Sequence, residues 1–481
     1  MSITRIRAAE IFPRPSRRFL GAPQIAILNR RESKPGGVRP HCSFRSRAGV
    51  KRERRACPSP VAGIDTRPAF MVNNRSMSEP VRPFKGLLYN GKYAAGIAGK
   101  VCPPYDIIPD PHPYYDRDPL NAIRLEVPLA AAGKDVYGTA KETLDAWLAE
   151  GVLSLDDRES IYVYEQAFTL GGKVRQRRGM IALVRLDPGR ILTHEETRRA
   201  AREDRRRLIK RLGVLTSLVF SMYEDRSKKI ERLIDAAPKE LLYDFTDELS
   251  IGNRFYRVSD PAAIGALASA IQDKKLYVAD GHHRLSVALD LKLPYAAMYL
   301  TDMRTEGIAI LPYHRTVLLK AGMTQVSILD ALSPYFDIAP AEYAAGAVCE
   351  RLIEGISSAP GLSFFLYFKG EKPGFFRLTQ KKAIDFDPES HPALRALKVS
   401  VIHRGVLKSL LKADDDAISY FNDADEAAGI VDAGAADLAV FVPATSVEEV
   451  KAIADNGLFM PPKSTYFYPK ILTGLVFHKY V

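Results

Sequence analysis

The alternation of hydrophobic and polar residues first predicts a pair of strands. Residues 160–170 (SIYVYEQAFTL) and 177–186 (RRGMIALVRL) are rich in β-branched and aromatic residues, and Gly171-Gly172 lies between them. Two glycines supply the positive φ angles that a tight hairpin turn requires. The pattern therefore predicts a β-hairpin over this part of the chain.

Other segments follow the helical period. Residues 137–150 (YGTAKETLDAWLAE) place Leu144, Trp147 and Leu148 on one face, and Gly151 follows as a stop signal. A strongly charged helix is expected near residues 198–211, and its charges are equally consistent with a solvated face and with a phosphate-binding surface.

A strand-to-helix junction is expected at residues 276–289, where the run Leu276–Ala279 gives way to helical spacing. Short apolar runs follow at 295–303 and 307–317, and a second hairpin is expected over 362–379. The C-terminal region alternates strand-like and helical stretches. Together these patterns predict an α+β fold with mixed sheets and helices.

Composition places the chain among large globular proteins, and its positive charge lies at one end. The 481 residues carry a net charge of +12, but residues 1–80 contain 17 of the 69 Lys and Arg and 5 of the 57 Asp and Glu, which leaves 52 of each elsewhere. The remainder is neutral overall, so general attraction to nucleic acid is not expected.

The leader, residues 1–76, has the Arg-, Pro- and Ser-rich composition of a disordered segment. Three interpretations are open: a basic tail that touches nucleic acid, an organellar transit peptide, or upstream sequence translated from a misassigned start. The third is preferred because Met77 opens MSEPVRPFKGLLYN, where structured-looking sequence begins.

The spacing of the cysteines and the length of the apolar runs bear on redox chemistry and localisation. The four cysteines are far apart without CxxC spacing, so neither a disulfide framework nor a zinc knuckle is indicated. No run reaches the roughly 18 apolar residues of a membrane helix. These features fit a cytoplasmic protein. The common nucleotide-binding and hydrolase motifs, such as GxxxxGK[ST] and GxSxG, are also absent.

Three short motifs carry candidate chemistry, and the first is His194-Glu195. A carboxylate beside a histidine could act as a general base that takes a hydroxyl proton. A structural explanation is preferred for this motif taken alone: Thr193 with Glu196 fits a capping box at a helix start.

The second motif is Asp280-Gly281-His282-His283-Arg284, at the predicted strand-to-helix junction. A glycine there lets backbone approach an anion, and the helix start offers free N–H groups. Arg284 adds a fork that matches phosphate, and the histidines add donors. Asp280 could hold Mg²⁺ or polarise a nucleophile. A capped helix with surface histidines is the alternative.

The third motif is the Pro-bracketed stretch Met460–Lys470, in which Lys463, Ser464 and Thr465 would suit an oxygen-rich ligand. The alternative is a rigid loop with aromatic packing.

Residues 80–481 resemble a bacterial family known as domain of unknown function 1015. The resemblance is carried by the three motifs above together with Pro83–Leu87, Pro103–Asp106 and Asn121–Leu125. The family name implies no activity.

The order of the three motifs is also remotely similar to that in the archaeal ADP-dependent free serine kinases of the ParB/sulfiredoxin-like superfamily. This resemblance implies a nucleotide-binding core of that type. It implies that Glu195 is the catalytic base and Asp280 the second essential carboxylate. It assigns Gly281, His282, His283 and Arg284 to phosphate binding, and His194, Lys463, Ser464 and Thr465 to the substrate loop.

Three departures qualify the resemblance. Glu195 and Asp280 are 85 residues apart, which is longer than in a compact kinase of this type. Residues 80–190 have no counterpart there, and Ser464 and Tyr466 replace parts of the kinase loop. Recognition of an amino acid is therefore less well supported than the phosphate site.

The resulting expectation is a nucleotide-dependent phosphotransferase that uses Mg²⁺ and ADP or ATP and acts on a small hydroxyl metabolite, with free L-serine as one candidate. A nucleotide-binding switch or nucleic-acid-associated regulator of ParB type is the first alternative. A metal-dependent phosphoesterase using His194, Glu195, Asp280 and His282 is the second. The expected regions are an N-terminal α+β region (77–190), the ParB/sulfiredoxin-like core (191–330) and a C-terminal α+β region that closes the site (331–481). Neither a membrane nor a nucleic-acid partner is expected.

Overall fold

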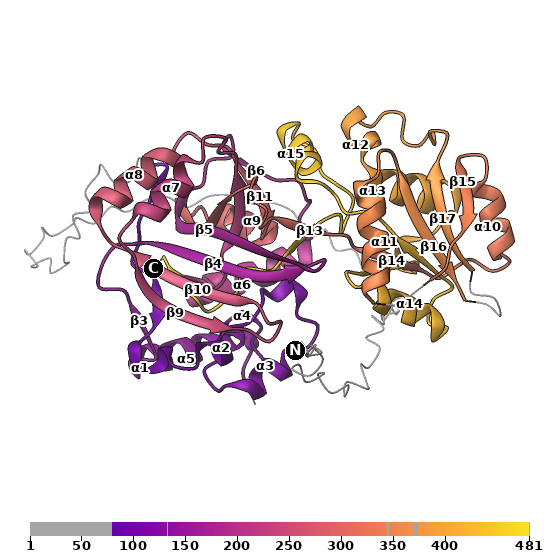
Figure 1. The fold of residues 1–481 in the computed structure, drawn as a ribbon. Helices are drawn as coiled ribbons and strands as arrows, with labels where there is room; N and C mark the ends of the chain where they lie inside the picture. The colour runs from indigo at the N-terminus through magenta and orange to yellow at the C-terminus, as the bar shows by residue number, and fades with distance from the viewer. Residues whose placement is uncertain (1–78, 132, 344–345, 370–373, 481) are drawn as a thin grey trace, which may run out of the picture. The chain divides into compact units, whose positions relative to one another are not determined.

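The computed structural model describes residues 79–131, 133–343, 346–369 and 374–480. The leader over residues 1–76 lies outside these ranges. The described strands form two large sheets and several short pairs, with helices packed on them (Figure 1). The expected combination of mixed sheets and helices is therefore confirmed.

The first large sheet has nine strands within the described ranges. Strands β6 and β11 pair in parallel, as do β8 and β12, and the remaining pairs are antiparallel, so the sheet is mixed. The path runs β6 (Ile191–Leu192), β11 (Leu276–Asp280), β8 (Val219–Tyr223), β12 (Tyr295–Asp302), β5 (Lys173–Arg185), β4 (Ile161–Leu170), β10 (Gly252–Val258) and β9 (Glu240–Thr246), and β1 (Val81–Arg82) pairs with β5.

Both faces of this sheet are buried, and the hydrophobic side chains of its central strands point alternately to one face and to the other. On β4, Tyr162 and Tyr164 face one side, and Ile161 and Val163 face the other. Successive residues of a strand point to opposite faces, so one strand serves two cores. The core that contains Tyr162 and Tyr164 is called the aromatic core, and the core that contains Ile161 and Val163 the aliphatic core. Helices α5 (Val136–Ala149) and α6 (Arg199–Leu212) contribute to the aromatic core. Helices α7 (Lys229–Ala236), α8 (Pro261–Ile271) and α9 (His282–Asp290) contribute to the aliphatic core.

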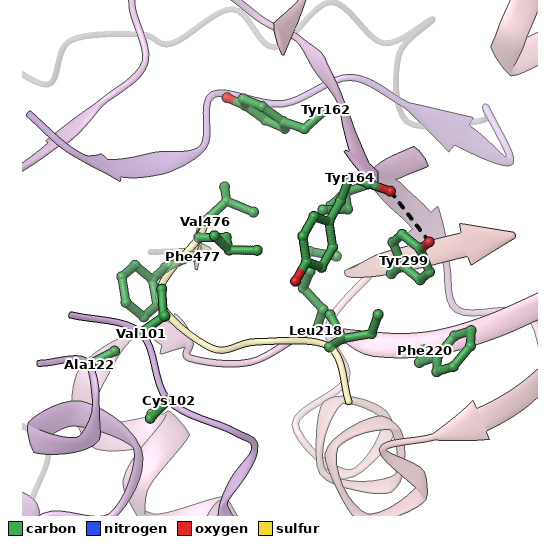
Figure 2. Packing of buried hydrophobic residues seen from close by; sticks show 14 of the residues in the cluster. Val101, Cys102, Ala122, Tyr162, Tyr164, Leu218, Phe220, Tyr299, Val476 and Phe477 are labelled. Atoms are coloured by element: carbon green, nitrogen blue, oxygen red, sulfur yellow. Dashed lines mark hydrogen bonds between the residues drawn. The ribbon is translucent and has the colours of Figure 1, made fainter. Parts of the chain in front are cut away.

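Figure 2 shows part of the aromatic core. The hydroxyl of Tyr299 donates to the carbonyl of Tyr164 at 3.4 Å, and both side chains are fully buried. Phe477, from the end of the chain, lies in the same core as Val101 and Ala122. Segments far apart in the sequence thus share this core.

The predicted local elements are confirmed. Strands β4 and β5 form the hairpin, and Gly171 and Gly172 have φ angles of 58° and 75°. Helix α5 buries Leu144 and Trp147, and its N-cap Asp135 accepts a hydrogen bond from the Gly138 N–H. The charged helix is α6, and the strand-to-helix junction is β11 followed by α9.

The predicted capping box at Thr193 and Glu196 is wrong. Helix α6 begins at Arg199, its N-cap is Arg198, and no side chain caps it. His194 is instead buried, and its carbonyl accepts a hydrogen bond from the Met460 N–H at 2.9 Å. Tertiary contacts therefore hold residues 193–197 outside the helix.

The second large sheet has six strands in the described ranges, all antiparallel. Its order is β15 (Phe336–Pro340), β17 (Gly374–Gln380), β16 (Ser363–Phe368), β19 (Leu438–Phe441), β14 (His314–Val317) and β18 (Ile418–Phe421). The second predicted hairpin, β16–β17, is confirmed. The helices of this region are α10 (Gln325–Leu332), α11 (Ala347–Ser358), α12 (Pro392–Ala396), α13 (Lys398–Ser400), the π-helix Val401–Leu410 and α14 (Ala424–Asp432).

Short strand pairs join the C-terminal segment to strands that lie outside the two large sheets. Strand β20 (Tyr466–Tyr468) pairs with β13 (Ala309–Leu311), and β21 (His478–Lys479) pairs with β7 (Val214–Leu215). They follow α15 (Val447–Asp455), whose capping box joins Ser446 and Glu449. The remaining elements are β2 (Leu87–Tyr89), β3 (Leu153–Leu155), α1 (Gly91–Ala94), α2 (Ile97–Lys100), α3 (His112–Arg117), α4 (Ile123–Glu126) and the 3₁₀ turns Tyr105–Ile107 and Asp415–Ala417.

Two further expectations concern regions and membranes. The nine-stranded sheet takes strands from both sides of residue 190, and the division into regions at 190 and 330 stays a prediction. Across the described ranges, none of the helices has the length and apolar character needed to cross a membrane.

Candidate functional site

A cavity of about 200 Å³ lies at the junction of β11 and α9. It brings together residues from all three sequence motifs: Glu195, Asp280, Gly281, His282, His283, Arg284, Lys463 and Thr465. Tyr105, Asp106, Arg198, Tyr313 and Lys470 also line it. Because these residues come from distant parts of the chain, the fold itself assembles the site.

The turn at Gly281 shapes one wall. Gly281 has a φ of 91°, in the left-handed region that glycine tolerates best, and it is the N-cap of α9. No side chain caps this helix, so the N–H groups of its first turn have no capping partner. These N–H groups lie beside the cavity. A helix start with free N–H groups favours an anion.

Asp280 is held by two cations. One carboxylate oxygen lies 2.5 Å from Nζ of Lys470 and the other 2.5 Å from Nη2 of Arg284. Burial alone would raise the pKa of Asp280, but Lys470 and Arg284 hold that pKa well below its usual range. Asp280 is therefore ionised and a poor proton acceptor at neutral pH.

Arg284 is largely committed to this network. Its guanidinium contacts Asp280 and also donates to the carbonyl of Leu218. Its Nε atom is buried without a hydrogen-bond partner. The predicted phosphate fork is therefore mostly engaged with the protein, and Arg284 adds its charge from the cavity wall.

Glu195 has the opposite electrostatics. It is half-buried, and its Oε2 lies 3.8 Å from Nδ1 of His282. Burial raises the pKa of Glu195, the charges of Asp280 and Asp106 raise that pKa further, and Lys463 opposes the rise. A carboxylate with a raised pKa is suited to accept a proton near neutral pH.

The three histidines are neutral at pH 7. Burial lowers the pKa of His194 to about 4 and that of His283 to about 4, and lowers the pKa of His282 well below its usual range. Nε2 of His282 is buried without a hydrogen-bond partner. His282 and His283 therefore offer hydrogen bonds to a ligand, and the positive charge comes from Arg198, Arg284, Lys463 and Lys470.

Two residues predicted for the substrate loop lie behind the cavity wall. Nε2 of His194 is 3.2 Å from the hydroxyl of Thr465, which does line the cavity. The Ser464 hydroxyl donates to the Pro461 carbonyl at 2.6 Å, and the Ser464 carbonyl accepts from Thr445 at 2.9 Å. Ser464 thus shapes the loop and does not face the cavity.

Sequence reasoning missed Asp106 and Lys470. Asp106 lies in the Pro103–Asp106 stretch, and Lys470 ends the third motif, so both stood beside recognised signals. Asp106 is exposed at the surface, yet the protein atoms around its carboxylate limit hydration, and this together with the nearby charge of Asp280 raises the pKa of Asp106, whereas Lys470 and Arg284 oppose the rise. The cavity therefore contains a carboxylate that sequence alone did not place there.

The residues around Asp280 do not fit a magnesium ion held by the protein. Both oxygens of Asp280 are engaged with cations, and the described ranges contain no group of three or more His, Cys, Asp or Glu side chains arranged to hold a metal. Mg²⁺ in protein sites needs carboxylate oxygens or phosphates that are free to coordinate it. The expectation that Asp280 holds Mg²⁺ directly is therefore not supported by these residues.

Comparison with solved structures gives distant similarities. A conserved hypothetical protein from Pyrococcus furiosus is 14% identical with a TM-score of 0.32, over 60% of this chain and 92% of that one. A free serine kinase in complex with AMP is 13% identical with a TM-score of 0.33, over 60% and 86% of the two chains. The protein SbnI from Staphylococcus aureus, truncated at its C-terminus, is 8% identical with a TM-score of 0.34, over 62% and 86%.

Among curated proteins, no match was found. A family model described as "Protein of unknown function (DUF1015)" matches residues 81–400. This range contains the first two motifs and ends before the third, at Met460–Lys470. Since the match covers well over half of the sequence, the chain belongs to the DUF1015 family.

Proposed function

We propose that this protein is a nucleotide-dependent phosphotransferase that acts on the hydroxyl group of a small metabolite. One observation carries the proposal: Glu195, a carboxylate with a raised pKa, shares one cavity with the uncapped start of α9 and with Lys463 and Lys470. A proton acceptor and a phosphate site within one small cavity are the two parts that such a reaction needs.

The transfer step assigns each group a role. The acceptor hydroxyl gives its proton to Glu195 as its oxygen forms a bond to the terminal phosphorus of the nucleotide. The bond between that phosphorus and the bridging oxygen breaks, and the shortened nucleotide leaves with the bonding electrons. The N–H groups at the start of α9, which follows Gly281, and the side chain of Lys463 stabilise the charge on the transferring group.

Asp280 has a positioning role in this proposal. Its lowered pKa makes it a weak base, and its two ion pairs fix the turn that precedes α9. The neutral rings of His282 and His283 supply hydrogen bonds to phosphate or to the acceptor.

The test is a screen of ADP and ATP, each with Mg²⁺, against small hydroxyl metabolites. L-serine is the first acceptor because the motif order resembles that of the free serine kinases. Mass spectrometry detects the phosphorylated product. Transfer by the wild type that is lost in Glu195→Gln supports the proposal, whereas binding without any transfer contradicts it and favours a nucleotide-binding switch.

A further inference from the structure

Two arginines, Arg177 on β5 and Arg315 on β14, are the largest completely buried side chains of the described ranges, each 0% exposed. Neither forms an ion pair with any described carboxylate. Burying a guanidinium without a counter-ion costs free energy, so its hydrogen-bond acceptors must offset this cost. The acceptors of these two arginines therefore indicate the role of each arginine.

Arg177 holds the backbone just before Lys470. It donates to the carbonyls of Tyr468, at 3.3 Å, and of Pro469, and it also donates to Oε1 of Gln166. The side-chain amide of Gln166 in turn donates to the carbonyl of Lys470 at 3.1 Å. Two side chains of the β4–β5 hairpin thus hold three successive backbone carbonyls, those of residues 468–470.

Lys470 extends from this fixed backbone into the cavity. Its Nζ lies 2.5 Å from Asp280 and 4.6 Å from the centre of the Tyr466 ring. Lys470 has a side-chain exposure of 9%, so its ammonium has few alternative positions. A continuous set of hydrogen bonds therefore runs from Arg177 through the backbone to Lys470 and Asp280.

Arg315 provides a natural comparison because it holds a different part of the same loop. It donates to the carbonyl of Tyr313 and, at 3.4 Å, to that of Lys463. It makes no hydrogen bond with residues 468–470. Removing either arginine therefore removes one fully buried cation, but only Arg177 contacts the backbone that carries Lys470.

We infer that Arg177 is a positioning residue, which fixes Lys470 so that its ammonium pairs with Asp280 at the cavity. The role of Lys470 toward phosphate rests on the proposed function. The position of Lys470 itself does not, so the two can be tested separately.

The first test measures the acetylation rate of Lys470 in the full chain without nucleotide, by mass spectrometry, with exposed Lys412 as the internal reference. Arg177→Met should raise the rate at Lys470 by roughly tenfold, the factor that corresponds to the loss of about one charge-assisted hydrogen bond. Arg315→Met, the matched control, should leave that rate unchanged. An equal rise at Lys470 in both variants, or no rise in Arg177→Met, would overturn the inference.

Arg177→Lys covers the case in which Arg177→Met does not fold. Lysine keeps the charge but cannot reach all three acceptors, so the rate at Lys470 should still rise selectively, by a smaller factor. An unchanged rate in a folded Arg177→Lys variant would count against the inference.

A double-mutant cycle tests the catalytic consequence. If Arg177 acts through Lys470, ADP should bind Arg177→Met/Lys470→Met about as weakly as it binds Lys470→Met. Fully additive losses would contradict that route. If ADP fails to bind the wild type, the proposed function fails, whereas the acetylation result stands on its own.

Discussion

Nδ1 of His282 lies 3.8 Å from Oε2 of Glu195, and burial favours the uncharged form of both groups. A neutral ring beside the carboxylate leaves the pKa of Glu195 raised, whereas a charged imidazolium would stabilise the carboxylate anion and lower that pKa. Glu195 can therefore accept a proton near neutral pH.

Glu195→Gln should lower kcat by about 10²- to 10⁴-fold, the usual contribution of a general base, and leave nucleotide affinity nearly unchanged. Steady-state kinetics and calorimetric nucleotide binding measure the two effects. Glu196→Gln, at the exposed neighbour, is the matched control and should keep full activity. Undiminished turnover by Glu195→Gln would remove Glu195 from the mechanism.

Lys463→Met should move the acidic limb of the activity profile to higher pH. Glu195 must be deprotonated to act, so activity falls as the pH drops through its raised pKa. Lys463 lowers that pKa, and removing its charge raises it further. The measurement is kcat/KM against pH for both proteins. An acidic limb at the same pH in both would show that Lys463 does not tune Glu195.

Asp280→Asn should destabilise the fold by about 3–5 kcal/mol, because it leaves two buried cations without their counter-ion. Urea unfolding measures the change. Asp145→Asn removes an exposed ion pair with Lys141 on α5 and should have little effect. Equal stability of the two variants would show that the pairs at Asp280 do not anchor the turn.

Gly281→Ala should weaken nucleotide binding and cost about 1–2 kcal/mol of stability, because alanine tolerates a left-handed φ poorly. Its Cβ would also lie 3.0 Å from Cζ of Arg284. Gly265→Ala on α8, where a Cβ meets nothing within 4 Å, should instead stabilise by about 0.5–1 kcal/mol. If the two variants bind nucleotide equally well, Gly281 has no special role.

His194→Asn should flatten the dependence of stability on pH below neutrality. The pKa of His194 is about 4 in the folded protein and ordinarily 6.5, so the unfolded chain takes up its proton first as the pH falls. This ring alone therefore destabilises the wild type by about 1.4 kcal/mol per pH unit between those values. Urea unfolding from pH 7 to pH 4 tests this, with exposed His112→Asn as the control. If stability depends on pH equally steeply in His194→Asn and in the wild type, the lowered pKa of His194 is contradicted.

The local elements could be predicted because their signals are local. The Gly171-Gly172 turn, the apolar face of α5 and the β11–α9 junction each depend on residues close together in the sequence. The capping box at Thr193 failed because burial of His194 and its bond to Met460 override a local preference.

The candidate site could be predicted only in part. Asp280–Arg284 stood out by their own chemistry, whereas Glu195 was assigned to the site through the resemblance to the free serine kinases. Asp106 and Lys470 were not assigned to the site, because their roles depend on pairing across the fold, as in the bond from Lys470 to Asp280. Ser464 was assigned to the ligand, but its hydroxyl is used by the backbone of its own loop.

The distance in sequence between partners has a consequence for the order of folding. The bond from Arg177 to Pro469 joins residues 292 positions apart, and the pair of Lys470 with Asp280 spans 190 positions. Closing such long loops costs chain entropy before any contact repays it, so they form late. During refolding, the sheets should become protected from hydrogen exchange first, and the cavity should be completed last.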